Sequence, residues 1–171
     1  MPSPLPPPVG FKEWSLVCRA LAAGRQTVIL RKGGIHEGRG GFSFQHDTFY
    51  LFPTEFHAQR QRIRPDELAA LEEAADPGSD RAGERDTVTI THWAEIIRKW
   101  MITDWPEAKA LEPRHIWTEE IVRERFDYTG DSCLHAAEVR VHPLPQPWEF
   151  PLEKRHGGCR SWLTLPAATT G

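Results

Sequence analysis

Cations and glycines gather between residues 26 and 64 in a pattern that suits the binding of an anion. Arg31 and Lys32 end an apolar run, and Gly33 and Gly34 follow directly. Because glycine opens a turn and leaves its backbone amides exposed, two cations are predicted to lie beside an anion-binding loop. The predicted ligand-binding residues combine these four with other cations, a hydroxyl, an imidazole and an indole: Arg31, Lys32, Gly33, Gly34, Arg39, Thr54, His57, Arg60, Arg62 and Trp117.

The chemistry of this set favours a nucleic acid as the ligand. Guanidinium and ammonium groups neutralise phosphates, and the cations suited to that role are Arg31, Lys32, Arg39, Arg60 and Arg62. Flat or hydrogen-bonding side chains contact bases, and the candidates are His46, His57 and Trp117. DNA or RNA is therefore the expected partner. This interpretation requires no cofactor and no bound metal.

Metal-dependent hydrolysis is the alternative chemistry. Its candidate residues flank the apolar run 49–52 and are His46, Asp47, Glu55 and His57. Imidazole and carboxylate groups on neighbouring strand ends are suitable metal ligands. A nuclease would use two carboxylates and a lysine, and these residue types are present at Asp86, Glu107 and Lys109. Neither set fixes a catalytic residue, so the sequence leaves open whether the protein is an enzyme.

The neighbouring cations Arg31 and Lys32 raise a question of direction. Successive residues of a strand point to opposite faces, so only one of the two would reach a surface site. We predict that Arg31 pairs with a buried carboxylate, with Glu13 or Glu37 as the nearest candidates, and that Lys32 is free at the surface. A turn that begins at Lys32 would instead bring both cations to solvent and form an anion pocket.

Composition excludes several broad classes. The 171 residues hold no apolar run near the roughly 18 residues of a membrane span, so no membrane partner is expected. Residues 1–10 lack the cationic start and apolar core of a secretory signal, and three cysteines at unrelated spacings favour a reducing cytoplasm. The chain contains no GxSxG elbow and no phosphate-binding P-loop, which removes the commonest hydrolase and nucleotidase classes. The oligomeric state does not follow from the sequence.

Charge is unevenly distributed along the chain. Residues 1–64 carry nine Lys/Arg against four Asp/Glu, whereas residues 65–127 carry eight against sixteen. The predicted anion-binding residues thus lie mostly in the basic third, which suits the salt-sensitive part of nucleic-acid binding. The alternative is that the acidic segment is simply a solvated pair of helices.

The spacing of apolar residues and the positions of turn residues predict an α+β fold, with a mixed, mainly antiparallel sheet or small barrel and packed helices. The predicted strands are 26–31, 41–44, 48–52, 87–91, 136–142 and 160–165, and the predicted helices are 11–23, 65–75, 92–101 and 118–126. Residues 1–10 are expected to form a disordered proline-rich arm, and 11–171 a single domain. The polar segment 76–86 is its one candidate internal boundary.

Several short blocks resemble the bacterial family of uncharacterised proteins described as domain of unknown function 1802. The matching blocks extend over most of the chain and are 12–14, 20–21 with Gly24, 31–35, 49–54 with His57, 115–117, 125–126, 139–141 and 158–159 with 161–162. Some family members lie beside restriction-endonuclease-type domains. The resemblance therefore implies a link to DNA recognition or defence.

A second resemblance concerns the N-terminal third. Residues 21–31 are similar to the arrangement of helix, glycine, basic residue and strand with arginine in PUA-like and ASCH barrels. Those barrels bind RNA, nucleotides or modified bases, so the resemblance implies a small barrel that reads nucleic acid through its loops. Residues 26–31 read QTVILR, without the acidic residue that those families often carry before the arginine.

Overall fold

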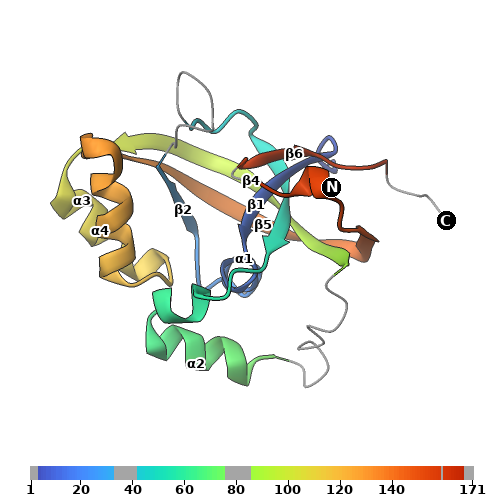
Figure 1. Ribbon diagram of the computed structural model, residues 1–171, viewed down its shortest axis with the longest axis horizontal. Coiled ribbons are helices and arrows are strands. Elements are labelled where there is room, and N and C mark those ends of the chain that lie inside the picture. The colour runs from blue at the N-terminus through green and yellow to red at the C-terminus, as the bar shows by residue number, and fades with distance from the viewer. Residues whose placement is uncertain (1–3, 33–41, 76–85, 159, 168–171) are drawn as a thin grey trace.

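The computed structural model describes residues 4–32, 42–75, 86–158 and 160–167, and these form a mixed six-stranded sheet with four α-helices (Figure 1). The strands are β1 Val9–Trp14, β2 Val28–Arg31, β3 Thr48–Thr54, β4 Thr87–Ile102, β5 Leu134–Pro151 and β6 Trp162–Thr164. The helices are α1 Ser15–Ala22, α2 Pro65–Glu73, α3 Trp105–Ala110 and α4 Glu119–Asp127. Short 3₁₀ turns cover Gln59–Arg62, Glu112–Arg114, Tyr128–Gly130 and Lys154–His156.

The strand order is β2-β5-β4-β3-β1-β6. β1 and β3 are parallel, and the other neighbouring strands of the sheet are antiparallel. β1 and β3 can be parallel because α1 and β2 lie between them in the sequence. This long connection lets the chain cross over and enter β3 in the same direction as β1. The structure thus confirms the predicted α+β class with a mainly antiparallel sheet.

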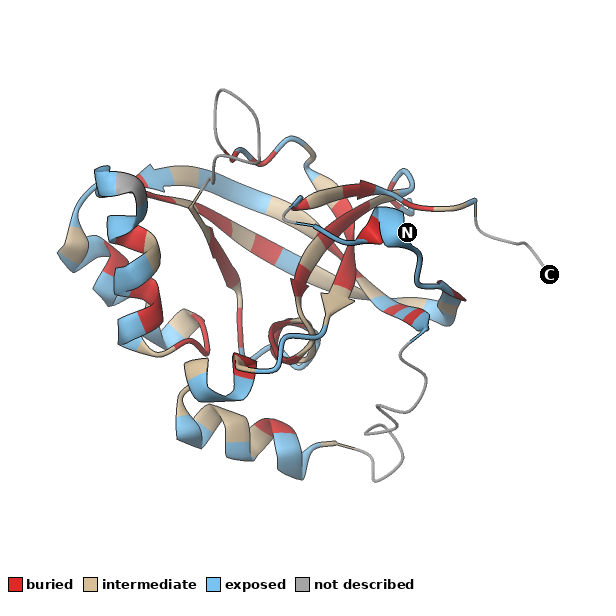
Figure 2. Ribbon diagram, viewed as in Figure 1, coloured by how far each residue is buried: buried red, intermediate tan, exposed pale blue. Residues whose placement is uncertain are grey.

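Both faces of the sheet bury apolar side chains. Along β3, Phe49 and Leu51 belong to the main core, while Tyr50 and Phe52 belong to a smaller cluster. Alternate residues of a strand point to opposite faces, so β3 lies between the two clusters. The main core also takes in the buried faces of α1 and α4, shown as red bands on those helices in Figure 2.

The sheet curls but does not close into a barrel. Its edge strand β2 approaches β1, which lies at the fifth position of the sheet. A side chain joins these two strands where a ladder of backbone hydrogen bonds would close a barrel. The Arg31 guanidinium of β2 donates a hydrogen bond to the backbone oxygen of Lys12 in β1. We call this junction, between Leu30–Arg31 of β2 and Lys12–Trp14 of β1, the seam.

The helix predicted over 92–101 is wrong, since these residues belong to β4. Register shifts between Ile90 and His92 and between Ile96 and Arg98 interrupt the alternation of the strand. Such bulges offset the apolar positions, so they recur three and four residues apart, as on a helix. The side chains share no single face: Trp93 packs in the smaller cluster, Ile96 and Trp100 pack against the main core, and Ile97 and Met101 are exposed.

Other expected elements have different bounds or are absent. The helix predicted over 11–23 begins only at Ser15, because Val9–Trp14 is the strand β1, which also begins inside the range expected to be an arm. Phe42 and Phe44 of the predicted strand 41–44 pack into the core without joining a strand. The helix predicted over 118–126 is confirmed as α4, which is capped by Thr118, since the Thr118 hydroxyl accepts a hydrogen bond from the Ile121 amide at 3.4 Å.

The second half of β5 is rich in proline. Pro143 pairs with His92 and Trp148 with Ile90, so residues 144–147 form a wide bulge opposite one residue of β4. Pro145 and Pro147 lie on this bulge, and both are exposed. On the side away from β4, β2 pairs with β5 over His135–Glu138.

Candidate nucleic-acid interface

The seam holds a buried carboxylate, that of Glu13. Only 2% of this residue is exposed. Its Oε1 accepts a hydrogen bond from the Trp14 amide at 2.9 Å, and its Oε2 lies 3.7 Å from a terminal nitrogen of Arg31. The hydroxyl of Thr54, at the end of the neighbouring strand β3, donates to the Glu13 backbone oxygen at 3.1 Å. The predicted pairing of Arg31 with an internal carboxylate, and with Glu13 in particular, is confirmed.

Arg31 fills the seam between the two strands. Its guanidinium carbon lies 4.7 Å from the centre of the Phe11 ring, so the cation rests on an aromatic face. Within the described part of the chain, neither Arg31 Nε nor Glu13 Oε2 has a hydrogen-bond partner. A buried polar atom without a partner costs about 1–3 kcal/mol. The seam therefore keeps one donor and one acceptor unsatisfied.

Arg125, in the last turn of α4, is the central cation of the region. Its guanidinium donates to the Leu30 backbone oxygen at 3.3 Å and lies 5.0 Å from the Trp14 ring and 4.6 Å from the Trp117 ring. Burial lowers the pKa of Arg125 to about 10; the Glu13 carboxylate raises this pKa in part, and the nearby charges of Arg31 and Arg62 lower it further. Arg125 thus stays cationic at neutral pH, and among the described residues it makes no ion pair with a carboxylate.

Flat groups continue outward from Arg125 as a single stack. The Trp14 ring lies 5.3 Å from the Phe56 ring, and the Arg62 guanidinium lies 5.5 Å from the Phe56 ring. We call Trp117, Arg125, Trp14, Phe56 and Arg62 the arginine–aromatic stack. One end is buried, since Trp117 has 0% exposure, and the other reaches solvent, since Phe56 has 38%.

The fold brings four of the predicted ligand-binding residues into this region: Arg31, Thr54, Arg62 and Trp117. Trp117 cannot stack on a base as predicted, because its ring is fully buried beneath Arg125. Lys32 is not free at the surface, and that prediction is wrong. Its ammonium donates to the Phe126 backbone oxygen at 2.9 Å and to that of Asp131, so it helps to hold the end of α4.

The remaining predicted residues lie elsewhere or outside the described chain. Arg60 is exposed and pairs with Glu72 of α2, which turns it away from the stack. His57 is exposed in the turn after β3. Gly33, Gly34 and Arg39 fall outside the described residues, as does the alternative partner Glu37.

The four residues of the hydrolase alternative do not come together. His46 packs against the Trp162 ring at 5.0 Å, and Asp47 pairs with Lys99 at 3.3 Å. Glu55 and His57 follow the other end of β3, whose seven residues separate the pairs by roughly 20 Å. Among the described residues, no group of three or more His, Cys, Asp or Glu side chains could hold a metal ion.

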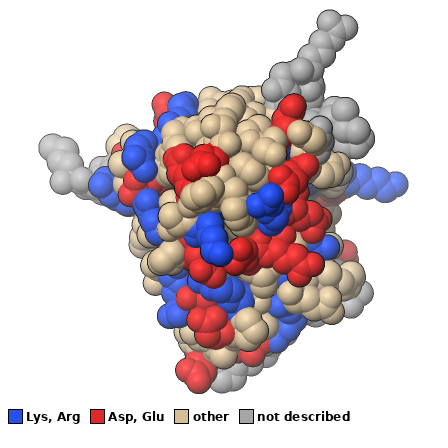
Figure 3. All heavy atoms as spheres, turned by 90° about the vertical axis from the view of Figure 1, so that its left-hand side faces the viewer, with Lys and Arg blue, Asp and Glu red and all other residues tan. Residues whose placement is uncertain are grey.

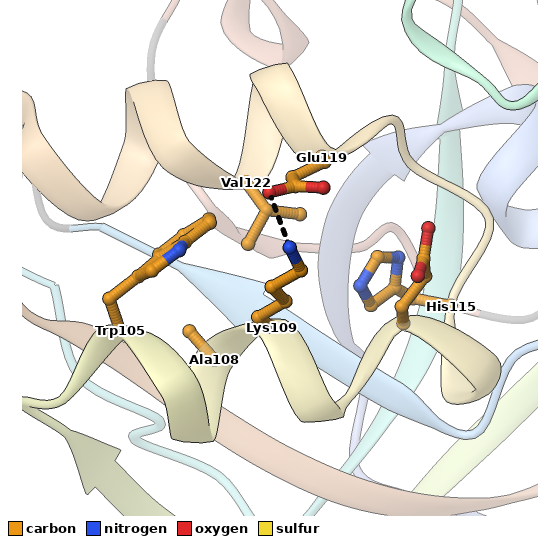
Figure 4. Close-up of a pocket in the computed structure, with 7 residues that line it drawn as sticks. Trp105, Ala108, Lys109, His115, Glu119 and Val122 are labelled. Carbon is orange, nitrogen blue, oxygen red and sulfur yellow. Dashed lines mark ion pairs between the residues drawn. The ribbon is translucent and has the colours of Figure 1, made fainter.

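A hollow between α3 and α4 is a separate feature (Figure 4). Trp105, Lys109, His115 and Glu119 are among its lining residues, and the Lys109 ammonium pairs with Glu119 at 3.3 Å across it. Lys109 lies on a helix and is engaged with Glu119, so it does not join the nuclease arrangement expected with Asp86. His115 is buried, and burial lowers its pKa to about 3, so its imidazole is neutral at pH 7.

The positive charge of the region is local. On the face that carries α3 and α4, cationic and anionic groups interleave instead of dividing into a basic and an acidic part (Figure 3). Arg62 pairs there with Glu124 of α4 at 3.6 Å, and Arg123 pairs with Asp127 at 2.7 Å. The described residues thus form no broad basic patch on this face, so attraction for an anion there depends on local cations such as those of the stack.

Three residues of the region were missing from the predicted set: Trp14, Phe56 and Arg125. Trp14 lies in the helix predicted over 11–23, and Arg125 lies in the helix predicted over 118–126. A signal was nevertheless present, because Trp14 and Arg125 both lie in blocks that carry the family resemblance. Phe56 gave no such signal beyond its position after an apolar strand.

The architecture matches that of ASCH proteins. Two solved structures, the crystal structure of ASCH from Zymomonas mobilis and that of a mutant of the same protein, are each 14% identical to this chain, with a TM-score of 0.50. Each match covers 92% of this chain and 87% of the other. The chain therefore has an ASCH-like fold.

The chain belongs to the family described as "Domain of unknown function (DUF1802)", whose model matches residues 10–171. Both resemblances expected from the sequence are thus confirmed. No curated protein matches the chain.

Proposed function

We propose that this protein is a nucleic-acid-binding module that uses Arg125 and Arg62 for phosphates, with Arg31 behind them. The supporting observation is that Arg125 is a cation stacked against Trp14 and Trp117 with no carboxylate partner in the described chain. A cation in a partly desolvated site attracts an anion more strongly than one in water does. A phosphate is the anion that a guanidinium binds with the best geometry.

Arg62 provides the accessible half of this site. Its ion pair with Glu124 spans 3.6 Å, and the Glu124 side chain is 62% exposed. Exposed pairs of this kind contribute little and are readily exchanged for another anion. Arg62 can therefore turn from Glu124 to a phosphate at small cost.

The fold supports the same proposal in a general way. PUA-like and ASCH barrels, to which the N-terminal third is similar, bind RNA, nucleotides or modified bases. The family resemblance, through members that lie beside restriction-endonuclease-type domains, favours DNA or a modified base and a role in defence. A metal-dependent hydrolase is less well supported, because His46, Asp47, Glu55 and His57 lie at two ends of β3.

We also propose that the protein acts in the cytoplasm, on the basis of its cysteines. Cys18 and Cys133 are free thiols, as expected where the environment is reducing. None of the described helices has the length and apolar character needed to cross a membrane.

Oligonucleotide binding measured by fluorescence anisotropy over a series of salt concentrations tests the proposal. The wild-type affinity is expected to fall linearly with salt on a double-logarithmic plot. Arg62→Gln should weaken binding to every sequence and reduce the slope by about 1. Arg140→Gln is the matched control, because Arg140 is an exposed arginine on β5 that pairs with Glu95.

Arg125→Gln should have a larger effect on affinity, and its melting temperature must be recorded because Arg125 also donates to Leu30. Binding that does not respond to salt, or that responds equally to Arg62→Gln and Arg140→Gln, would contradict the proposal. Stoichiometric metal in the purified protein together with absent oligonucleotide binding would favour the hydrolase alternative.

A further inference from the structure

The outer end of the arginine–aromatic stack indicates whether the site suits single-stranded or double-stranded nucleic acid. Phe56 is a large apolar residue with 38% exposure, in the segment that follows β3. Its inner neighbour is the Trp14 ring at 5.3 Å, with the two ring planes inclined by 34°. Phe56 is therefore supported from below by a second aromatic ring and still reaches solvent.

A cation lies over each of the two outer rings of this region. Arg62 lies 5.5 Å from the Phe56 ring and Arg125 lies 5.0 Å from the Trp14 ring. A nucleic acid strand offers the complementary groups, because flat bases follow one another along a chain of charged phosphates. Surfaces that pair aromatic rings with cations bind unpaired strands, since every exposed base offers a flat face for stacking.

A base in a duplex cannot use such a ring, because its faces are covered by neighbouring base pairs. Only phosphates and groove edges of a duplex are accessible. Phe56 would then contribute nothing to duplex binding, whereas Arg62 and Arg125 would contribute to both forms. The aromatic half of the stack thus distinguishes single strands from duplexes.

We propose that the ligand is single-stranded nucleic acid, with one base stacked on Phe56 in place of Arg62, which turns from the ring to bind the adjacent phosphate. The inference rests on the proposed nucleic-acid-binding function and adds to it the form of the strand and the residue that selects it. Phe56 is a specificity-determining residue in this view, and Trp14 supports its ring from behind.

The test compares one labelled oligonucleotide as a single strand and as a duplex, over a series of salt concentrations, with the full-length chain. Phe56→Leu removes the ring but keeps an apolar side chain, and Phe56→Trp keeps a ring. Loss of one stacked base weakens binding by about 5- to 150-fold, so Phe56→Leu should lose that much affinity for the single strand and none for the duplex. Phe56→Trp should retain single-strand affinity.

Leu152→Ala is the control for a general loss of apolar surface. Leu152 is 47% exposed and follows the end of β5, away from the stack. This variant should bind as the wild type does.

The outcomes separate the two proposals. Salt-sensitive binding that is equal for single strand and duplex, and unchanged by Phe56→Leu, overturns the stacking inference and leaves the proposed function in place. Absence of salt-sensitive binding to either form overturns the proposed function itself. Equal loss of affinity in Phe56→Leu and Phe56→Trp, with unchanged melting temperatures, also overturns the assignment of stacking to Phe56.

Discussion

The ammonium group of Lys32 lies 2.9 Å from the backbone oxygen of Phe126, in the last turn of α4. The last carbonyl groups of a helix lack partners within the helix, and they carry the negative end of its dipole. Lys32 therefore joins the end of β2 to the end of α4. Lys32 therefore has a structural role, whereas the sequence predicted that it is a free cation at the surface.

Lys32→Ala is accordingly expected to lower the free energy of unfolding. A hydrogen bond from a charged donor is worth about 1.5–3 kcal/mol, and partial exposure of the site places the expected loss near the lower value. Chemical denaturation measures the change. Lys154→Ala is a suitable control because Lys154 is exposed, and equal stability of the two variants would show that the contact with α4 contributes nothing.

Arg31→Ala should be more destabilising than Lys32→Ala. Removal of the guanidinium leaves the Glu13 carboxylate buried without its cation, which costs about 3 kcal/mol. The double variant with Glu13→Ala should recover part of this loss, because no uncompensated charge remains. Thermal and chemical denaturation of the two single variants and the double variant give the coupling energy, and additive losses would argue against the pair.

Acid should destabilise the protein through His115. Its pKa is lowered from 6.5 to about 3, mainly by burial and further by Arg64 and Arg125. Between these values the unfolded chain binds a proton that the folded chain does not, so the free energy of unfolding falls as the pH decreases, by up to about 1.4 kcal/mol per pH unit. Relative to pH 7, the loss at pH 5 should be about 2 kcal/mol greater for wild type than for His115→Gln.

Urea denaturation at pH 7 and pH 5 measures this difference. The comparison uses the two proteins at each pH, since burial also lowers the pKa of His92, His135 and His156. The same pH dependence in wild type and in His115→Gln would show that His115 is protonated in the folded state.

The thiol of Cys18 should react slowly in the native protein. Burial raises its pKa well above the usual value, and the nearby Glu13 carboxylate raises it further. The thiolate is the reactive form, so little of it is present at pH 8. In a chain with Cys133→Ser and Cys159→Ser, an aromatic disulfide reagent should label Cys18 far faster in urea than in buffer. Similar rates in both would contradict this.

The sequence was informative where one local signal dominated. Pro65 and the following carboxylates marked the start of α2, and Thr118 marked the start of α4. It failed at β4, where bulges imitate helical spacing, and at β1, where a strand passes directly into α1 at Ser15. In both places pairing with strands far away in the chain decides the structure, and a local pattern does not contain that information.

The candidate site was predictable only in part. The pairing of Arg31 with an internal carboxylate followed from strand geometry, and Glu13 was one of two candidates, the other being Glu37. The role of Arg125 could not be inferred, because it depends on α4 placing that guanidinium against Trp14, which lies more than one hundred residues earlier in the sequence. Trp117 was misjudged for the same reason, since only the packed structure shows that its ring is covered.

The proline-rich second half of β5 affects how copies of the chain meet in concentrated solution. A strand edge with regularly spaced amide donors is a template on which another chain can add a strand. Proline has no amide hydrogen, and Pro143, Pro145, Pro147 and Pro151 occupy alternating or near-alternating positions of this segment. A second molecule therefore finds an interrupted row of donors along this edge, and stacking of molecules into fibre-like assemblies through it is disfavoured.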